Sequence, residues 1–317
     1  MLECSVASDL KCSYTHDASG LYTCVALNLQ LEKDNPLIDS VKGEHLPGKE
    51  QINVERLMVV CSSNKFLSSD IFQKFPNLLD LSVLLYSVEN IVQGNFHGAQ
   101  HLRRIIINNN YITQLTDNIF SGAPNLEIIQ MNGNSIYSLS IQTFAGLTKL
   151  ETLYLEHSFI NSLPKGIFDE LINLRNVSFF GNMFKSLDGD LFKNNLKITH
   201  LWLSNNQLSV IGSNLITHLQ SLEIAEFYNN PCISSSLYDS VNVNALSEKI
   251  AECTESNKPE QKLLLAENQK EKDTVKIDLL SILNEVLREK ITEKIQEIET
   301  VKQKLNSCQM LNQINKY

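Results

Sequence analysis

Residues 101–123 read HLRRIIINNNYITQLTDNIFSGA. Apolar side chains and one asparagine stand at set intervals in this segment, at Leu102, Ile105, Ile107, Asn110, Ile112, Leu115, Phe120 and Ala123. The pattern returns 24 residues later, at Leu126, Ile129, Met131, Asn134, Ile136, Leu139, Phe144 and Leu147. Eight such repeats follow one another without insertion, and they begin at Val54, Leu78, Leu102, Leu126, Leu150, Leu174, Ile198 and Leu222. This regularity predicts stacked units that share one core.

The spacing matches L-x-x-L-x-L-x-x-N-x-L, the signature of leucine-rich repeats. Its L-x-L portion predicts a short strand whose alternate side chains point into the core and outward. Stacked strands of this kind predict a curved α/β repeat solenoid with a parallel sheet on its inner, concave side. We expect the asparagine to bond backbone groups of its own turn and of the next repeat. Ser62, Tyr86 and Ser158 replace it in three repeats, where looser turns are expected.

The repeats divide the chain into four predicted parts. An N-terminal cap covers residues 1–53, the eight repeats cover 54–229, a C-terminal cap covers 230–257 and a helical tail covers 258–317. The tail contains 11 Lys and Arg against 10 Asp and Glu, whereas the whole chain has a net charge of −9. Residues 1–257 therefore carry a net charge of −10, and the acidity belongs to the solenoid.

Cysteines lie where the ends of the solenoid need caps. The stretch CSYTHDASGLYTC predicts a disulfide-closed hairpin whose second arm has alternating apolar residues, namely Val25, Leu27, Leu29 and Leu31. The predicted pairs are Cys12–Cys24, Cys4–Cys61 and Cys232–Cys253, although the four N-terminal cysteines allow three connectivities. The last pair encloses a predicted helix and would stabilise the fold by about 3 kcal/mol. Such pairs favour an oxidising compartment, and free thiols in a cytosolic protein are the alternative.

The tail predicts a coiled coil. Apolar residues follow a heptad pattern at Ile277, Leu280, Asn284, Leu287, Ile291, Lys294, Ile298, Val301, Leu305 and Cys308, in which Asn284 and Lys294 are the polar members. Cys308 occupies a d position, where a parallel dimer would bring two copies together, so we expect an intermolecular disulfide. A single amphipathic helix that folds back on the solenoid, with Cys308 as a free thiol, is the alternative.

The outward strand residues predict a binding face. Tyr154, Phe180, Trp202 and Tyr228 gather in the C-terminal half of the concave side, and Glu156, His200 and Glu226 accompany them. Clustered aromatic anchors are typical of interfaces, although rings that pack on one another or against the helical tail are the alternative. Asn176 belongs to the sequon Asn-Val-Ser and falls on the same face. A glycan there would obstruct the face, so either Asn176 is unoccupied or the ligand binds elsewhere.

Several classes of function are disfavoured. The negative charge argues against a nucleic-acid partner, and no run of eighteen apolar residues predicts a membrane span. The sequence shows no catalytic motif, cofactor motif or metal-ligand spacing, so we expect neither an enzyme nor a cofactor. The N-terminal stretch MLECSVASDLKCS lacks the apolar core of a signal peptide, so secretion would require a leader that is not present in this chain.

Cysteine-capped repeats joined to a coiled coil resemble the leucine-rich immune proteins of mosquitoes, and CSYTHDASGLYTC and HLPGKEQINVERL look like stretches of secreted insect leucine-rich proteins. The resemblance implies a secreted protein that pairs through its tail by a disulfide and carries a complement-like thioester protein. The departures are a shorter tail and the absence of closely spaced cysteines at the junction, where only Cys253 lies.

The main hypothesis is therefore a secreted, innate-immune recognition scaffold that forms a homodimer, or a heterodimer with a related leucine-rich repeat chain. A receptor ectodomain or matrix protein without its anchor, and an enzyme inhibitor, are the alternatives.

Overall fold

The computed structural model describes residues 9–27, 37–60, 65–84, 88–237 and 243–254. The chain divides into two compact units, Met1–Asn257 and Lys258–Tyr317, and every described residue belongs to the first. The predicted coiled coil, the Cys308 disulfide and the Cys4–Cys61 pair lie outside the described residues, so they stay predictions.

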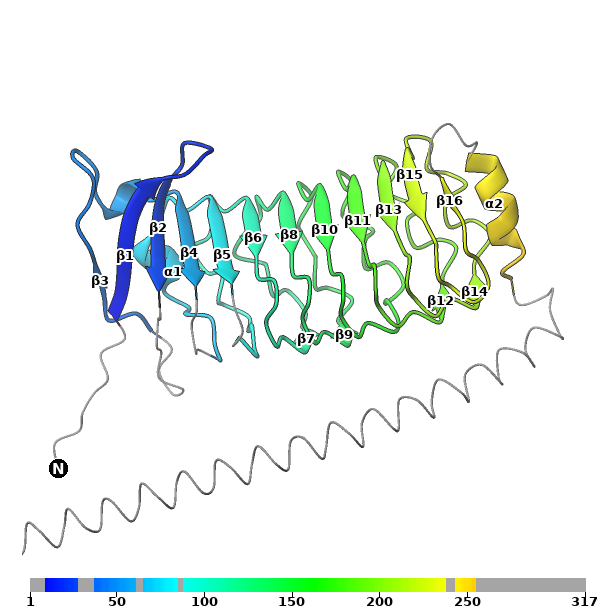
Figure 1. Cartoon of the computed structure of the whole chain (residues 1–317), viewed down its shortest axis with the longest axis horizontal. Helices are drawn as coiled ribbons and strands as arrows, with labels where there is room; N and C mark the ends of the chain where they lie inside the picture. The colour runs from blue at the N-terminus through cyan, green and yellow to red at the C-terminus, as the bar shows by residue number, and fades with distance from the viewer. Residues whose placement is uncertain (1–8, 28–36, 61–64, 85–87, 238–242, 255–317) are drawn as a thin grey trace, which may run out of the picture. The chain divides into compact units, whose positions relative to one another are not determined.

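One sheet of twelve strands runs through the described part of the chain (Figure 1). Eight of these strands, one for each predicted repeat, run parallel to one another, and successive ones lie in register 24 residues apart. They are β4 (Arg56–Val60), β5 (Asp80–Leu84), β6 (Arg104–Ile106), β8 (Ile128–Gln130), β10 (Thr152–Tyr154), β11 (Asn176–Ser178), β13 (His200–Trp202) and β15 (Ile224–Glu226). Seven turns of the solenoid join the eight strands.

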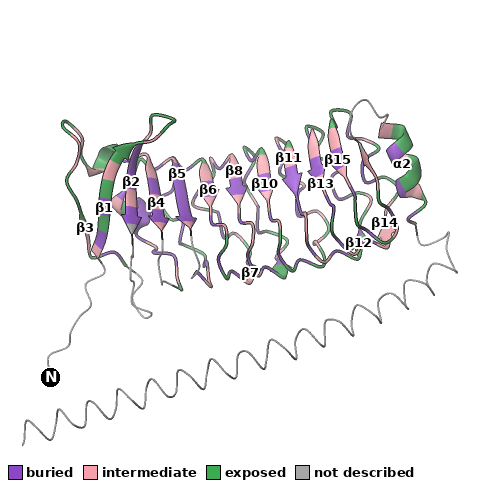
Figure 2. Ribbon diagram, in the orientation of Figure 1, coloured by how far each residue is buried: buried purple, intermediate pink, exposed green. Residues whose placement is uncertain are grey.

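The alternation predicted for each strand is confirmed. The inward position of every parallel strand is fully buried, as Leu57, Leu81, Ile105, Ile129, Leu153, Val177, Leu201 and Ala225. Figure 2 shows buried and half-buried residues along these strands, with exposed residues on the first hairpin and on the last helix. Because no single turn can enclose its own apolar side chains, each turn is stable only against its neighbours.

The return segments between the strands are mostly turns, so the prediction of an α/β repeat is wrong. Among the described repeats the one α-helix is α1 (Ile71–Lys74), and short strand pairs join β7 (Gln114–Leu115) to β9 (Ser138–Leu139) and β12 (Ser186–Leu187) to β14 (Val210–Ile211). Elsewhere, the return segments contain turns closed by a backbone hydrogen bond between residues three apart. In one of them the Ala123 N–H donates to the Phe120 carbonyl at 2.9 Å. Such turns rise about 2.0 Å per residue against about 1.5 Å in an α-helix, so a short segment reaches the next strand.

A row of phenylalanines fills the core behind the sheet. Its members stand at one position of successive repeats, as Phe72, Phe96, Phe120, Phe144, Phe168 and Phe192. Ring centroids of neighbours lie between 5.3 and 6.1 Å apart. These spacings are typical of favourable aromatic pairs, so each ring supports the next along the solenoid axis.

A row of buried asparagines links neighbouring turns by hydrogen bonds. In Asn134 the Oδ1 atom accepts the Ile112 N–H at 3.2 Å, and Nδ2 donates to the Ile107 carbonyl at 2.8 Å. The same two bonds recur at Asn110, Asn182, Asn206 and Asn230. Asn134 Nδ2 also donates to the Met131 carbonyl of its own turn at 2.8 Å, so the expected bond within the turn is confirmed. The partners of the first two bonds belong to the preceding repeat, so the expectation of bonds to the next repeat is wrong. They are the backbone groups just after the preceding strand, where the sheet no longer supplies partners.

The repeat that contains Ser158 departs from this pattern. Ser158 is buried, and its hydroxyl lies 3.5 Å from the Glu156 carbonyl of its own turn. The residue before it, His157, has a φ of 50°, a left-handed conformation that the other described repeats give to asparagine or glycine at the same position. The strand register is nevertheless unchanged, because β10 pairs with both β8 and β11. Ser62 and Tyr86 lie outside the described residues.

A hairpin caps the N-terminal end of the core. Strands β1 (Asp9–His16) and β2 (Tyr22–Leu27) are antiparallel, a disulfide joins Cys12 to Cys24 as predicted, and β2 pairs with β4. The buried face of β2 carries Tyr22, Cys24 and Ala26. Val25, which the sequence placed in the apolar alternation, lies on the opposite face and is only half-buried. Register explains this, because Cys24 lies opposite the inward Leu57. Strand β3 (Ser40–Lys42) and the 3-10 helix η1 (Gln51–Asn53) complete the cap.

The C-terminal cap contains the predicted disulfide and helix. Cys232 bonds to Cys253, and between them lies α2 (Val243–Ala251), which buries Leu246 and Ile250 against the last repeat. Strand β16 (Ser236–Leu237) runs antiparallel to β15 and ends the sheet.

The shared core predicts a large cost for truncating an inward residue. Leu153→Ala removes a fully buried side chain between β8 and β11 and should lower the free energy of unfolding by about 2–5 kcal/mol. Leu196→Ala removes a leucine that is 55% exposed and should change it by less than about 0.5 kcal/mol. Urea titration measures both, and equal effects would contradict a shared core.

The asparagine row predicts that the Ser158 repeat can be stabilised. Ser158→Asn would supply an acceptor for the Ile136 N–H and a donor to the Met131 carbonyl, by analogy with Asn134, and should raise the unfolding free energy by about 1–2 kcal/mol. The reverse change one repeat later, Asn182→Ser, should lower it by about 1–3 kcal/mol because two buried groups lose their partner. A stability of Ser158→Asn at or below wild type, measured by the same titration, would show that this turn has no room for the amide.

Candidate functional site

The last four parallel strands position the predicted binding residues. Tyr154, Ser178, Trp202 and Glu226 are register partners on β10, β11, β13 and β15. A second row follows directly after these strands, as Glu156, Phe180, Ser204 and Tyr228. Inward neighbours such as Leu153 and Leu201 are fully buried, so both rows point to the concave side. We call Tyr154, Phe180, Trp202 and Tyr228 the aromatic patch.

Two members of the patch meet across a serine. The ring centroids of Tyr154 and Trp202 lie 6.0 Å apart in an edge-to-face arrangement, although their strands are separated by β11. Strands two apart lie about 9.6 Å from each other, so both rings lean over the intervening position. That position is Ser178, which is fully buried. The outward serine thus forms the floor beneath the two rings and is not itself exposed.

Trp202 is held on a second side by His200. Their ring centroids lie 5.4 Å apart, and the His200 Nδ1 atom lies 2.8 Å from the Thr199 hydroxyl oxygen, which fixes the imidazole. Trp202 is half-buried, so part of the indole still faces solvent. The only tryptophan of the chain is therefore supported by neighbours and also accessible.

Phe180 has a partner that sequence reasoning missed. The exposed His157 lies edge-on to Phe180 with ring centroids 5.1 Å apart. A Cβ atom on Gly181 would lie 2.8 Å from the His157 Nδ1 atom, so the glycine makes room for this imidazole. The signal was available in the sequence, because histidine replaces the asparagine or glycine found at this position in the other described repeats.

Tyr228 is bound to the C-terminal cap. Its hydroxyl lies 2.6 Å from the Ser236 Oγ atom on β16, and its N–H donates to the Ser204 Oγ atom at 3.0 Å. The ring is 41% exposed and extends the patch toward the end of the solenoid. Glu226 is half-buried beside Trp202 in the strand register.

Glu156 supplies negative charge beside the rings. Its N–H donates to the Asn132 Oδ1 atom at 2.9 Å, which fixes the backbone after β10. Burial raises the pKa of the Tyr154 hydroxyl, and the charge of Glu156 raises it further. The carboxylate therefore acts on the same side of the sheet as the Tyr154–Trp202 pair.

The sequon asparagine lies at the centre of this face. Asn176 is half-buried on β11, and its Nδ2 atom donates to the Thr152 Oγ1 atom at 3.3 Å. A glycan on Asn176 would stand between Thr152 on β10 and His200 on β13, two residues along the strands from Tyr154 and Trp202.

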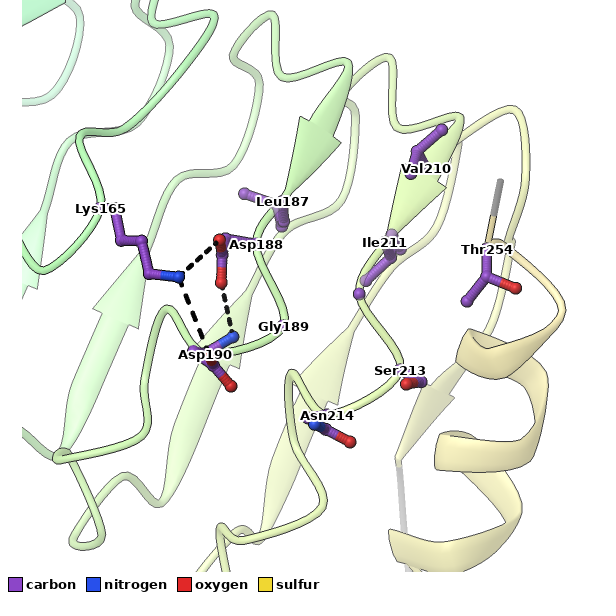
Figure 3. A pocket seen from close by; sticks show the side chains of 11 residues that line it. Lys165, Leu187, Asp188, Gly189, Asp190, Val210, Ile211, Ser213, Asn214 and Thr254 are labelled. Atoms are coloured by element: carbon purple, nitrogen blue, oxygen red, sulfur yellow. Dashed lines mark hydrogen bonds and ion pairs between the residues drawn. The ribbon is translucent and has the colours of Figure 1, made fainter. Parts of the chain in front are cut away.

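A groove lies elsewhere, on the return side near the C-terminal cap (Figure 3). It measures about 550 Å³, and Gly189 and Gly212 approach closely beneath it. Lys165 Nζ lies 3.7 Å from Asp188 Oδ2 and 4.0 Å from Asp190 Oδ2. These carboxylates are exposed, and the lysine already balances part of their charge.

Three more exposed aromatic residues lie on the flank of the solenoid. They are Tyr111, Tyr137 and Phe159, which lie just after the row position held by Asn110, Asn134 and Ser158. Their side chains are 51%, 54% and 48% exposed. Sequence reasoning missed them because it considered only the strand positions.

The described part of the chain contains neither a cluster of metal ligands nor a membrane-spanning helix. No three His, Cys, Asp or Glu side chains gather there as metal ligands would. No helix within the described ranges is both long and apolar enough to cross a membrane.

Two family models match the repeats. One, described as leucine rich repeat, matches residues 86–136, 100–160 and 124–184. The other, described as BspA type leucine rich repeat region (6 copies), matches residues 158–252. Comparison with curated protein sequences gave no match.

Two solved structures show similar folds. A TLR13–ssRNA13 complex matches with a TM-score of 0.50 and 22% identity, over 56% of this chain and 25% of that one. The octameric complex of Latrophilin 3, Unc5D and FLRT2 matches with a TM-score of 0.46 and 19% identity, over 62% of this chain and 67% of that one. The chain thus spans about a quarter of the TLR13 chain, and the likeness concerns the fold alone. The family matches and the stack of 24-residue turns together identify residues 86–252 as leucine-rich repeats.

Proposed function

We propose that the chain is a secreted recognition protein that binds a protein partner through the concave face, with the aromatic patch at the centre of the contact. The observation that carries this proposal is the position of Trp202, which Tyr154 and His200 support while part of its ring faces solvent. Buried aromatic anchors dominate the energy of many interfaces. An anchor that is already held in place loses little freedom on binding.

The charge of the face favours protein over nucleic acid. The TLR13 structure contains ssRNA, as its description states. A phosphate backbone is bound mainly by Lys and Arg. On this chain the outward positions of β10, β11, β13 and β15 contain neither residue, and residues 1–257 have a net charge of −10. A protein surface is therefore the partner that we propose.

Secretion is proposed from the two disulfides, Cys12–Cys24 and Cys232–Cys253, because such bonds persist in oxidising compartments. The resemblance to mosquito leucine-rich immune proteins supports an innate-immune role, with a complement-like thioester protein or a related leucine-rich repeat chain as partner. The role is one of binding and not of catalysis. A receptor ectodomain or an enzyme inhibitor would use the same face.

Two variants test the aromatic patch, Trp202→Ala within it and Tyr137→Ala outside it. Wild-type protein is immobilised, and the proteins that it retains from the extracellular fluid of its source are quantified by mass spectrometry. Trp202→Ala should reduce retention of the specific partners at least tenfold, because one supported anchor can contribute more than about 1.4 kcal/mol. Tyr137→Ala removes an exposed aromatic residue from the flank and should leave retention unchanged.

Thermal unfolding of both variants controls for folding. Partners that are retained equally by wild type and Trp202→Ala would place the binding site elsewhere and overturn the proposal.

Pairing through residues 258–317 is proposed from their heptads, and Cys308 is proposed as the covalent link. The full chain from an oxidising host should run as a dimer on a non-reducing gel and as a monomer after reduction. Cys308→Ser should abolish the covalent dimer, and a chain that ends at Asn257 should be a monomer in light scattering. A chain ending at Asn257 that still dimerises would refute pairing through the tail.

A further inference from the structure

The chemistry of the partner can be inferred from the charge beside the patch, and this inference rests on the proposed function. Several acidic side chains elsewhere along the sheet are paired with arginine. Asp80 Oδ2 lies 2.8 Å from Arg56 Nη2 and 3.8 Å from Arg104 Nε. Glu127 and Glu151 lie 3.7 and 3.9 Å from Arg103 and Arg175. Asp80, Glu127 and Glu151 therefore each lie close to at least one arginine.

Glu156 differs from these residues. Among the described residues, no lysine or arginine nitrogen lies within 4.0 Å of its carboxylate. Its register neighbours on the next repeats are Phe180 and Ser204, and the outward positions of β10, β11, β13 and β15 contain no lysine or arginine. A carboxylate without a cationic partner thus stands beside the joined rings of Tyr154 and Trp202.

This combination selects among possible occupants. An apolar partner that covered the rings would also take the Glu156 carboxylate out of water without compensation, which is costly. An acidic partner would be repelled. A cationic side chain satisfies both features, because ammonium and guanidinium groups are attracted to the faces of tryptophan and tyrosine and pair with carboxylates. Arginine fits best, because its planar group both stacks on rings and forms paired hydrogen bonds.

We propose that the partner presents a lysine or arginine side chain, preferably arginine, which lies against the Tyr154–Trp202 rings and forms an ion pair with Glu156. Because Ser178 is buried beneath the two rings, the rings themselves form the surface that the side chain would contact. Phe180 borders this subsite on the next repeat. The partner surface is therefore basic, in keeping with the net charge of −10 on residues 1–257.

Trp202 allows a direct test, because it is the only tryptophan of the chain. The full-length protein is titrated with acetyl-Gly-Arg-Gly-amide and, in parallel, with an analogue in which citrulline replaces arginine. The citrulline side chain has nearly the same shape as that of arginine but carries no charge. We expect a saturable change of tryptophan fluorescence with the arginine peptide, at a dissociation constant at least about fivefold lower than with citrulline, as for one ion pair of about 1 kcal/mol.

Two carboxylate variants locate the effect. Glu156→Gln should remove the preference for arginine over citrulline, whereas Glu223→Gln, which alters an exposed carboxylate just before β15, should leave it unchanged. Equal binding of the two peptides by wild type, or an arginine preference that survives Glu156→Gln, would overturn the inference. Unfolding curves that coincide for wild type and Glu156→Gln confirm that the fold is intact.

The inference and the proposed function can fail separately. Partner retention that depends on Trp202, together with equal binding of the two peptides, would leave the protein-binding function standing and reject the basic side chain. An arginine preference that depends on Glu156, together with partner retention that ignores Trp202, would support the subsite and reject the concave face as the site for the whole partner.

Discussion

One buried asparagine in most of the described turns holds the neighbouring turns of this solenoid in place. Burial of leucine, isoleucine and phenylalanine provides most of the driving force, but that force has no direction. The amide of Asn134 has direction, because it accepts from Ile112 and donates to Ile107 of the preceding turn. It supplies partners to backbone groups that the sheet leaves behind, where an unpaired group would be costly. These hydrogen bonds set the position of each turn against its neighbour, and the inward leucines and the phenylalanine row pack within that spacing.

The regular stack explains how four aromatic residues from different turns reach one surface. Each turn places its outward residues one strand spacing from the last, so side chains far apart in sequence become neighbours. A small residue between two large ones then allows them to meet, as Ser178 does beneath Tyr154 and Trp202. Identical turns would produce a uniform surface, and the differences between turns produce the site.

The least regular described turn lies beside this site. Ser158 lacks the amide that links its neighbours, and His157 adopts a left-handed backbone that is costly for histidine. In exchange, the imidazole reaches Phe180 at the border of the patch. The face also differs in charge along its length, since Asp80 pairs with both Arg56 and Arg104, whereas Glu156 has no arginine or lysine within 4.0 Å among the described residues. The irregular turn at Ser158 and the unpaired charge of Glu156 therefore both lie beside the aromatic patch.

The sequence by itself determined the repeat length, the inward residue of each strand and the strands that carry Tyr154 and Trp202, because a strict period and side-chain alternation depend only on local spacing. It predicted the two cap disulfides, but it left three connectivities open for the N-terminal cysteines, and the structure decided that Cys12 pairs with Cys24. It suggested α-helical return segments, which are mostly turns, and bonds from the asparagines to the next repeat, which run to the preceding one. It also gave no sign that Ser178 is covered, and although His157 stands out in the sequence as a departure from asparagine or glycine, its contact with Phe180 could not be read from it. Only the tertiary structure decided these features, because they depend on the distance and direction between turns that are 24 or 48 residues apart.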